Sequence, residues 1–154
     1  MISSYFDESG THDGSLVIVV AGLVSTPIRW EKLAKEWQRV LERAGLDDFH
    51  TADCCTGYGV FQGWEPERRK QLLISLVQIV KRHVMYRTWT AIVMADYNAL
   101  MEKNDLDYAI CAFGCASRLR TLSLSLLSQP LIPYIFDRGG RGGERALAAF
   151  NKLI

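Results

Sequence analysis

The sequence predicts an α/β domain in which helices flank a mixed β-sheet. Runs of β-forming residues alternate with segments whose apolar residues recur at helical spacing. The first two β-forming runs are joined by a short polar connection, which predicts an antiparallel start. The later runs are separated by helices, as parallel neighbours require. With 154 residues, of which 49% are hydrophobic, we expect a single domain over residues 1–154 with its own core.

The first third of the chain predicts a hairpin followed by a helix. Residues 2–6 form a short β-forming run, and residues 16–24 form a continuous apolar run typical of a buried strand. Residues 9–14 between them are rich in turn-forming types. Thr26-Pro27 predicts the start of a helix, and Gly45 its end. The apolar face of this helix comprises Trp30, Leu33, Trp37, Val40, Leu41 and Ala44.

The middle of the chain predicts a loop, a second helix and a strand. Residues 47–63 show no clean periodicity and are interpreted as a long loop, a kind of segment that is often functional. Pro66 opens the next helix. Residues 86–95 form a strand that ends at Asp96. The apolar face of the helix comprises Leu72, Leu73, Leu76, Val77 and Val80.

The last third predicts a long helix, a strand and the beginning of another helix. Asp105 is the expected cap of the long helix, and Gln129-Pro130 ends it. Residues 131–136 form a strand that ends at Asp137, and a helix begins at Glu144. The expected apolar face comprises Leu106, Ala109, Ile110, Phe113, Leu119, Leu122 and Leu126, with Cys111 and Cys115 nearby as buried, unreactive thiols.

Charge and cysteine content limit the class of protein. Eighteen basic and seventeen acidic residues give a formal charge of +1, which excludes an overtly polycationic nucleic-acid binder. The charges are nevertheless grouped into acidic and basic blocks, so a local basic surface near an acidic site remains compatible with the total. The longest apolar run is too short to span a membrane, and no secretory leader is evident. We expect a cytoplasmic protein with reduced thiols and no membrane partner.

Carboxylates at strand ends are the main candidates for chemistry. Asp7-Glu8 follows the first strand, and Asp96 and Asp137 each follow a later one. If these strands are parallel, the carboxylates converge, and hard oxygen donors suit Mg²⁺ or Mn²⁺. Successive strand residues point to opposite faces, so Asp7 ranks before Glu8 as a ligand. The structural alternative is that both are ordinary turn residues.

A second cluster lies in the long loop, at His50, Asp53 and Cys54. His50 and Asp53 are three residues apart and fit on one helical turn. One hypothesis is that His50 contacts a phosphate or positions water. A zinc site with Cys54 is a second hypothesis, although no further Cys/His pair has suitable spacing. A hydrogen-bonded loop histidine is the structural alternative.

Basic residues in two segments are candidate phosphate contacts. Residues 138–143 combine four glycines with Arg138 and Arg141, and glycine allows backbone N–H groups to approach an anion. This loop lacks the Lys-Ser/Thr of a P-loop, so a nucleotide cofactor is not expected. Arg68 and Arg69 form the other basic cluster. A flexible link and a solvated helix face are the respective structural alternatives.

Several short motifs resemble the domain-of-unknown-function 3800 (DUF3800) family. These motifs are the opening residues 5–10 (Tyr-Phe-Asp-Glu-Ser-Gly), the His-containing residues 49–53 (Phe-His-Thr-Ala-Asp) and residues 135–138 (Ile-Phe-Asp-Arg). The resemblance implies an RNase H-like fold and divalent-metal nuclease chemistry. By position, it implies that Asp7, Glu8 and Asp137 are the metal ligands, and that His50 and Asp53 are accessory residues.

The resemblance also has one departure. The family usually continues to a further acidic segment, whereas Glu144 is the only carboxylate after Asp137 here. We therefore expect either a C-terminally truncated chain or a domain that lacks the last acidic element of the family. The leading hypothesis is a Mg²⁺- or Mn²⁺-dependent nuclease-type domain acting on RNA or DNA. The alternative is an inactive binding or assembly module of the same fold. The sequence does not distinguish RNA from DNA and does not indicate an oligomeric state.

Overall fold

The computed structural model describes residues 2–10, 12, 14–101, 107–122 and 133–136. Contacts divide the chain into two compact units. The sheet unit comprises Met1–Ser25 and Met85–Ile154, and the helical unit comprises Thr26–Val84. Within the described ranges, no helix is both long and apolar enough to cross a membrane.

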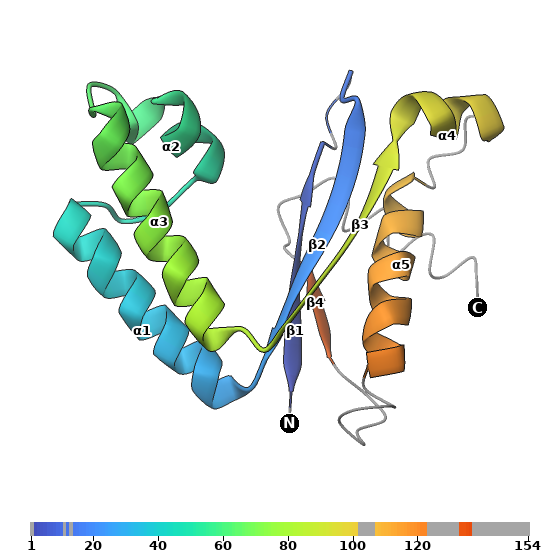
Figure 1. Ribbon diagram of the computed structural model, residues 1–154, viewed down its shortest axis with the longest axis horizontal. Coiled ribbons are helices and arrows are strands. Elements are labelled where there is room, and N and C mark those ends of the chain that lie inside the picture. Colours follow the sequence, from blue (N-terminus) through green and yellow to red (C-terminus); the bar gives the residue numbers. More distant parts are fainter. Residues whose placement is uncertain (1, 11, 13, 102–106, 123–132, 137–154) are drawn as a thin grey trace. The chain divides into compact units, whose positions relative to one another are not determined.

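A four-stranded mixed sheet, in the order β3-β2-β1-β4, forms the framework of the sheet unit (Figure 1). Its strands are β1 (Ser3–Ser9), β2 (Val17–Ser25), β3 (Tyr86–Val93) and β4 (Tyr134–Phe136). β2 pairs antiparallel with both β1 and β3, whereas β4 runs parallel to β1. The predicted α/β class and the mixed sheet with an antiparallel start are confirmed.

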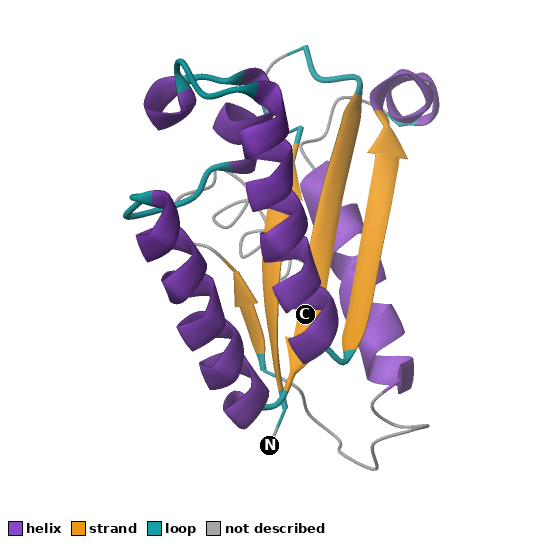
Figure 2. Cartoon of the chain, turned by 60° about the vertical axis from the view of Figure 1, so that its left-hand side comes forward, coloured by secondary structure: helices purple, strands orange, loops and turns teal. Residues whose placement is uncertain are grey.

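One face of the sheet is covered by α5 (Asp107–Leu122) (Figure 2). Alternate residues of β1 and β2 point toward this helix, and they share a core with its small side chains. Their core comprises Ile2, Phe6, Ile18, Val20, Val24, Tyr108, Cys111, Ala112, Cys115 and Leu119. The short helix α4 (Met94–Leu100) directly follows β3.

The buried face of α5 differs from the predicted apolar stripe. Ile110 and Phe113 are 40% and 55% exposed, whereas Cys111 and Cys115 are fully buried. Small side chains allow the helix backbone to approach the sheet closely, and at Gly114 an added Cβ would lie 2.8 Å from Oγ1 of Thr90. Close packing of helix and sheet therefore outweighs the hydrophobicity of the larger residues. The expectation of buried cysteines is confirmed.

Two long helices dominate the helical unit. The long helices are α1 (Pro27–Ala44) and α3 (Pro66–His83). Between them in the chain lie the short helix α2 (Thr51–Thr56) and the 3₁₀ helix η1 (Gly59–Phe61). The predicted caps of α1 are confirmed, because Oγ1 of Thr26 accepts a hydrogen bond from the Arg29 N–H and Gly45 adopts φ 73°. The core of this unit comprises Leu41, Leu46, Cys54, Phe61, Leu72, Leu76 and Ile79.

The prediction of a structureless loop over residues 47–63 is wrong, because α2 and η1 lie within it. Phe61 is only 1% exposed, and its ring packs edge-on against Phe49 and Trp64, with centroid separations of 6.0 and 5.4 Å. Helices of three and six residues are too short to display a hydrophobic period. The segment is folded by its aromatic contacts, which the pattern of the sequence does not reveal.

Candidate functional site

Asp7 and Glu8 lie within β1 and not beyond its end. The strand continues through Ser9 because the antiparallel ladder extends to the pair of Ser9 and Val19. The turn begins at Gly10, which has φ 78°, and an added Cβ there would lie 1.9 Å from the Val17 carbonyl oxygen. The expectation that these carboxylates follow the strand is therefore wrong by three residues.

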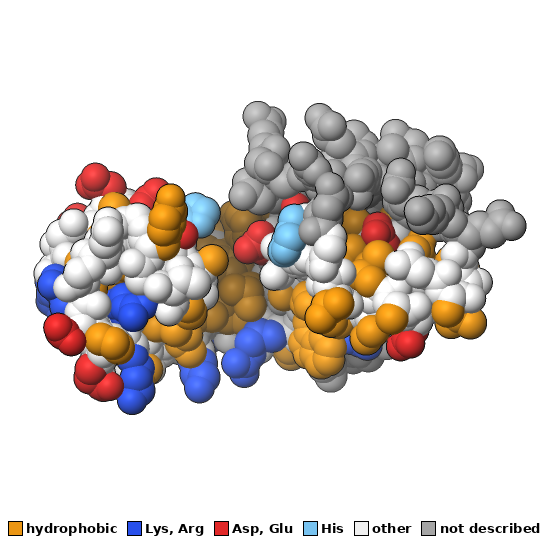
Figure 3. Space-filling model, turned by 90° about the horizontal axis from the view of Figure 1, so that it is seen from above, with side chains coloured by type: hydrophobic (Ala, Val, Ile, Leu, Met, Phe, Trp, Pro, Cys, Tyr) orange, Lys and Arg blue, Asp and Glu red, His pale blue; other side chains and the backbone are white. Residues whose placement is uncertain are grey.

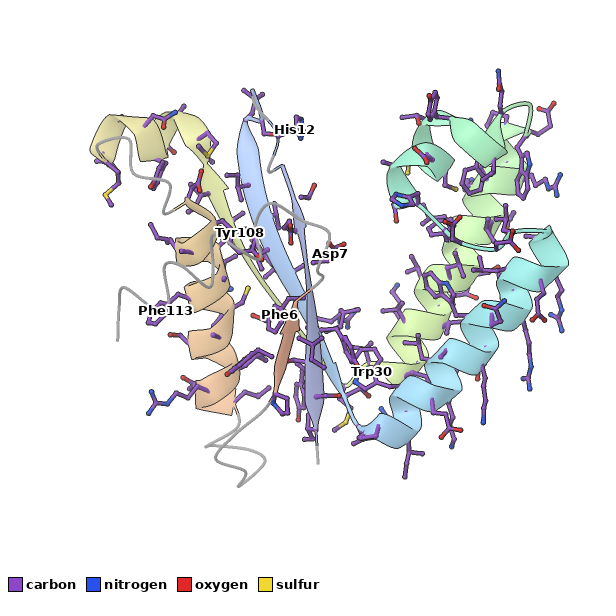
Figure 4. The ribbon with its side chains drawn as sticks, turned by 180° about the vertical axis from the view of Figure 1, so that it is seen from behind. Phe6, Asp7, His12, Trp30, Tyr108 and Phe113 are labelled. Atoms are coloured by element: carbon purple, nitrogen blue, oxygen red, sulfur yellow. The ribbon has the colours of Figure 1, made fainter. Side chains whose placement is uncertain are left out.

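Because they are neighbours in an extended strand, Asp7 and Glu8 point to opposite faces of the sheet. Asp7 is exposed, and its Oδ1 accepts a hydrogen bond of 2.9 Å from the Glu8 N–H. Figure 4 shows Asp7 on the face away from α5, whereas Tyr108 lies between α5 and the sheet. The geometrical reason for ranking Asp7 before Glu8 is thus present in the structure.

Glu8 is half-buried beside the first turn of α5. The Tyr108 hydroxyl donates a hydrogen bond of 3.5 Å to Glu8 Oε2. Burial raises the pKa of Tyr108, and the negative charge of Glu8 raises it further. The phenol therefore stays protonated and acts as a donor to the carboxylate. Sequence reasoning missed Tyr108, since nothing in the local pattern connects two residues separated by 100 positions.

β1 and β4 pair in parallel up to the residues that directly precede Asp7 and Asp137. Phe6 is in register with Phe136, and Asp7 and Asp137 are the next residues of their respective segments. Asp137 itself lies outside the described residues. Asp96 does not end a strand as predicted, but lies exposed in the first turn of α4. Asp96 follows β3, and β2 lies between β3 and β1, so Asp96 is not a ladder neighbour of Asp7.

The second cluster belongs to the helical unit. His50 is the exposed N-cap residue of α2, and Asp53 is half-buried in its first turn. Cys54 is buried, and its thiol contacts the Arg69 carbonyl oxygen at 3.6 Å. Burial raises the pKa of Cys54, which disfavours the thiolate that zinc would require. Among the residues that the structure describes, no group of three His, Cys, Asp or Glu side chains is placed to hold a metal ion.

Arg68 and Arg69, two of the arginines predicted to contact phosphate, already make contacts within the helical unit. Arg68 stacks over the Trp64 ring, with its guanidinium carbon 3.5 Å from the centroid. Nη1 of Arg69 donates to the carbonyl oxygens of Cys54 and Cys55 at 2.8 and 3.0 Å. Arg69 thereby satisfies carbonyls at the C-terminal end of α2 and joins this helix to α3.

The predicted site residues thus form two groups. Asp7 and Glu8 belong to the sheet unit, whereas His50, Asp53, Arg68 and Arg69 belong to the helical unit. Arg138, Arg141 and the rest of the glycine-rich loop over residues 138–143 lie outside the described residues.

Compared with known proteins, the chain matches no family model, and no curated protein is significantly similar to it.

Proposed function

We propose that this chain is a divalent-metal-dependent, nuclease-type domain with an RNase H-like fold. The observation that carries the proposal is the setting of Asp7, an exposed carboxylate on a central strand of the sheet. β1 pairs in parallel with the short strand that directly precedes Asp137. This register supports a site in which the two carboxylates approach each other. The mixed sheet with its antiparallel start is also compatible with an RNase H-like fold.

The donor chemistry fits the proposed metal. Asp7 and Asp137 offer hard carboxylate oxygens, which Mg²⁺ and Mn²⁺ prefer. A bound ion of this kind supplies Lewis acidity toward a phosphodiester. Asp7 binds the metal from the face of β1 that points away from α5. Glu8 is held on the other face by Tyr108, and it supports β1 without contacting the same ion.

A non-catalytic binding or assembly module is the second candidate function. The opposite orientations of Asp7 and Glu8 favour it, because only one of the two adjacent carboxylates, Asp7, then points away from α5 toward a metal ion. Nucleic acid is the proposed partner in both cases, with RNA and DNA treated equally. The two candidates differ in whether phosphodiester cleavage accompanies binding.

A cleavage assay with matched carboxylate variants tests the proposal. Labelled single- and double-stranded RNA and DNA are incubated with Mn²⁺ and with wild type, Asp7→Asn, Asp137→Asn or Asp96→Asn. Asp96 is an exposed acid of α4 outside the proposed site, so its variant controls for lost charge. We expect cleavage by wild type and Asp96→Asn, and a loss of about 100-fold or more in the other two variants.

Calorimetric titration with Mn²⁺ separates the two candidates. Metal binding that disappears in Asp7→Asn, together with cleavage, supports the nuclease. Metal or nucleic-acid binding without cleavage of any of the four substrates supports the binding module. The absence of Mn²⁺ binding by the wild-type protein would contradict the metal site.

A further inference from the structure

A groove of the helical unit lies between α1 and α3, apart from the candidate site residues described above. It has a volume of about 280 Å³. Val40 and Ile79 contribute apolar surface to it, and Ile79 is buried. The polar lining comprises Glu36, Arg39, Arg43, Ser75, Gln78 and Arg82. On the surface of this unit, Figure 3 shows basic and acidic side chains close together.

Glu36 is fully engaged with neighbours on α3. Its Oε2 accepts from Nη1 of Arg82 at 2.5 Å, and its Oε1 lies 3.0 Å from Nε2 of His83. The hydrogen bond from His83 lowers the pKa of Glu36, and the charge of Arg82 contributes to the same effect. Glu36 and Arg82 thus neutralise each other at one side of the groove.

Arg39 and Arg43 have no carboxylate within ion-pair distance among the described residues. They are four residues apart on α1, so their guanidinium groups lie on the same face of the helix. Like charges at this spacing destabilise a helix slightly, and the cost is removed when an anion lies between them. Arg43 is in the last turn, where the helix dipole also favours a cation, but Arg39 is in the interior and lacks that benefit.

The groove therefore presents two uncompensated guanidinium groups on one wall and the Gln78 amide on the other. Guanidinium groups bind the oxygens of phosphate in a bidentate manner, and the amide N–H₂ adds a neutral donor. The apolar surface of Val40 and Ile79 reduces the local dielectric and strengthens these contacts relative to open water. We propose that this groove binds a phosphate group, held by Arg39, Arg43 and Gln78.

The phosphate can belong to a small phosphorylated compound or to a nucleic-acid backbone. Inorganic pyrophosphate and a 5′-fluorescein-labelled oligothymidylate serve as the two probes, measured by calorimetry and by fluorescence anisotropy. Both titrations contain EDTA, so they do not depend on the metal site proposed for Asp7. Failure of the nuclease proposal and failure of this one are then distinguishable.

Three variants of the 154-residue chain test the assignment. Arg39→Gln/Arg43→Gln removes the two proposed charges. Arg29→Gln/Lys32→Gln removes two exposed cations of the same helix that lie outside the groove, so this control has the same net charge as Arg39→Gln/Arg43→Gln. Gln78→Ala changes the opposite wall without altering charge. Circular dichroism and thermal melting verify that each variant is folded.

We expect Arg39→Gln/Arg43→Gln to weaken binding of at least one probe by about tenfold or more. Arg29→Gln/Lys32→Gln is expected to change the binding affinity by less than about twofold, and Gln78→Ala is expected to weaken binding by about threefold. Binding of pyrophosphate alone assigns a small phosphorylated ligand, whereas binding of the oligonucleotide, with or without pyrophosphate, assigns a backbone phosphate. The proposal is overturned if neither probe binds the wild-type protein, or if the two charge variants weaken binding equally.

Discussion

Replacing Gly22 with alanine should destabilise the sheet unit, although alanine suits a strand better than glycine does. Gly22 of β2 lies opposite Phe6 of β1, and both are buried in the core beneath α5. An added Cβ would lie 2.3 Å from Cε1 and 2.7 Å from Cδ1 of Phe6. Ordinary carbon contacts are about 3.5–4.0 Å, so the ring must retreat by roughly 1 Å.

The magnitude follows from two opposing terms. Overpacking of a well-packed core typically costs about 1–3 kcal/mol. The lower conformational entropy of alanine in the unfolded chain returns about 0.5–1 kcal/mol. Because Phe6 is only 4% exposed and has little space to retreat into, we expect a net loss of about 1–2 kcal/mol in the free energy of unfolding.

A double-mutant cycle with urea denaturation checks this reasoning. In a Phe6→Leu background Cε1 and Cζ, which would lie 2.3 and 2.9 Å from the new Cβ, are absent, so the cost of Gly22→Ala should fall. Ala21→Val is a suitable control, since Ala21 is the exposed neighbour on the other face of β2, and a change of less than about 0.5 kcal/mol is expected there. An equal cost of Gly22→Ala in both backgrounds, or a gain in stability in wild type, would refute the argument.

Three further predictions concern the helical unit. Arg69→Ala removes two hydrogen bonds to the last carbonyls of α2, so it should lower the free energy of unfolding by about 1–3 kcal/mol and speed amide exchange in α2. Arg68→Ala is the control, because it loses only a stacking contact and should lower the free energy of unfolding by about 0.5–1 kcal/mol. Because His83 lowers the pKa of Glu36, this carboxylate stabilises the fold above its ordinary pKa of 4.5, and the benefit is lost as the pH falls through the lowered value. Glu36→Gln should therefore be less stable than wild type at pH 7, and the difference should shrink in acid titrations; a constant difference would contradict the ion pair. Ellman's reagent should modify one thiol quickly in the native protein, and Cys55→Ser should abolish this fast phase, because the other three cysteines are buried.

Local signals in the sequence predicted several elements accurately. Thr26 and Gly45 determine the ends of α1 through a side-chain cap and a left-handed backbone, effects that act within four residues. Pro66 likewise marks the start of α3. The short polar connection between the first two apolar runs correctly predicted the antiparallel hairpin of β1 and β2. These features are predictable because each depends on neighbours in the chain.

Other features depend on packing partners that are distant in the sequence. Ile110 and Phe113 have the hydrophobicity of core residues, yet the close approach of α5 to the sheet buries the smaller Cys111 and Cys115 in their place. The aromatic contacts around Phe61 fold a segment whose local pattern resembles a loop. Here tertiary packing overrides what local hydrophobicity and periodicity indicate.

The sequence alone ranked Asp7 before Glu8 as a candidate ligand, because adjacent residues of any extended strand face opposite sides. Only the tertiary structure decided what each side contains. Asp7 is exposed and points away from α5, whereas Glu8 lies beside Tyr108, a partner 100 residues away in the chain. The alternation of side chains is a property of the local backbone, but the environment on each face of β1 is created by the strands and helix that pack around it.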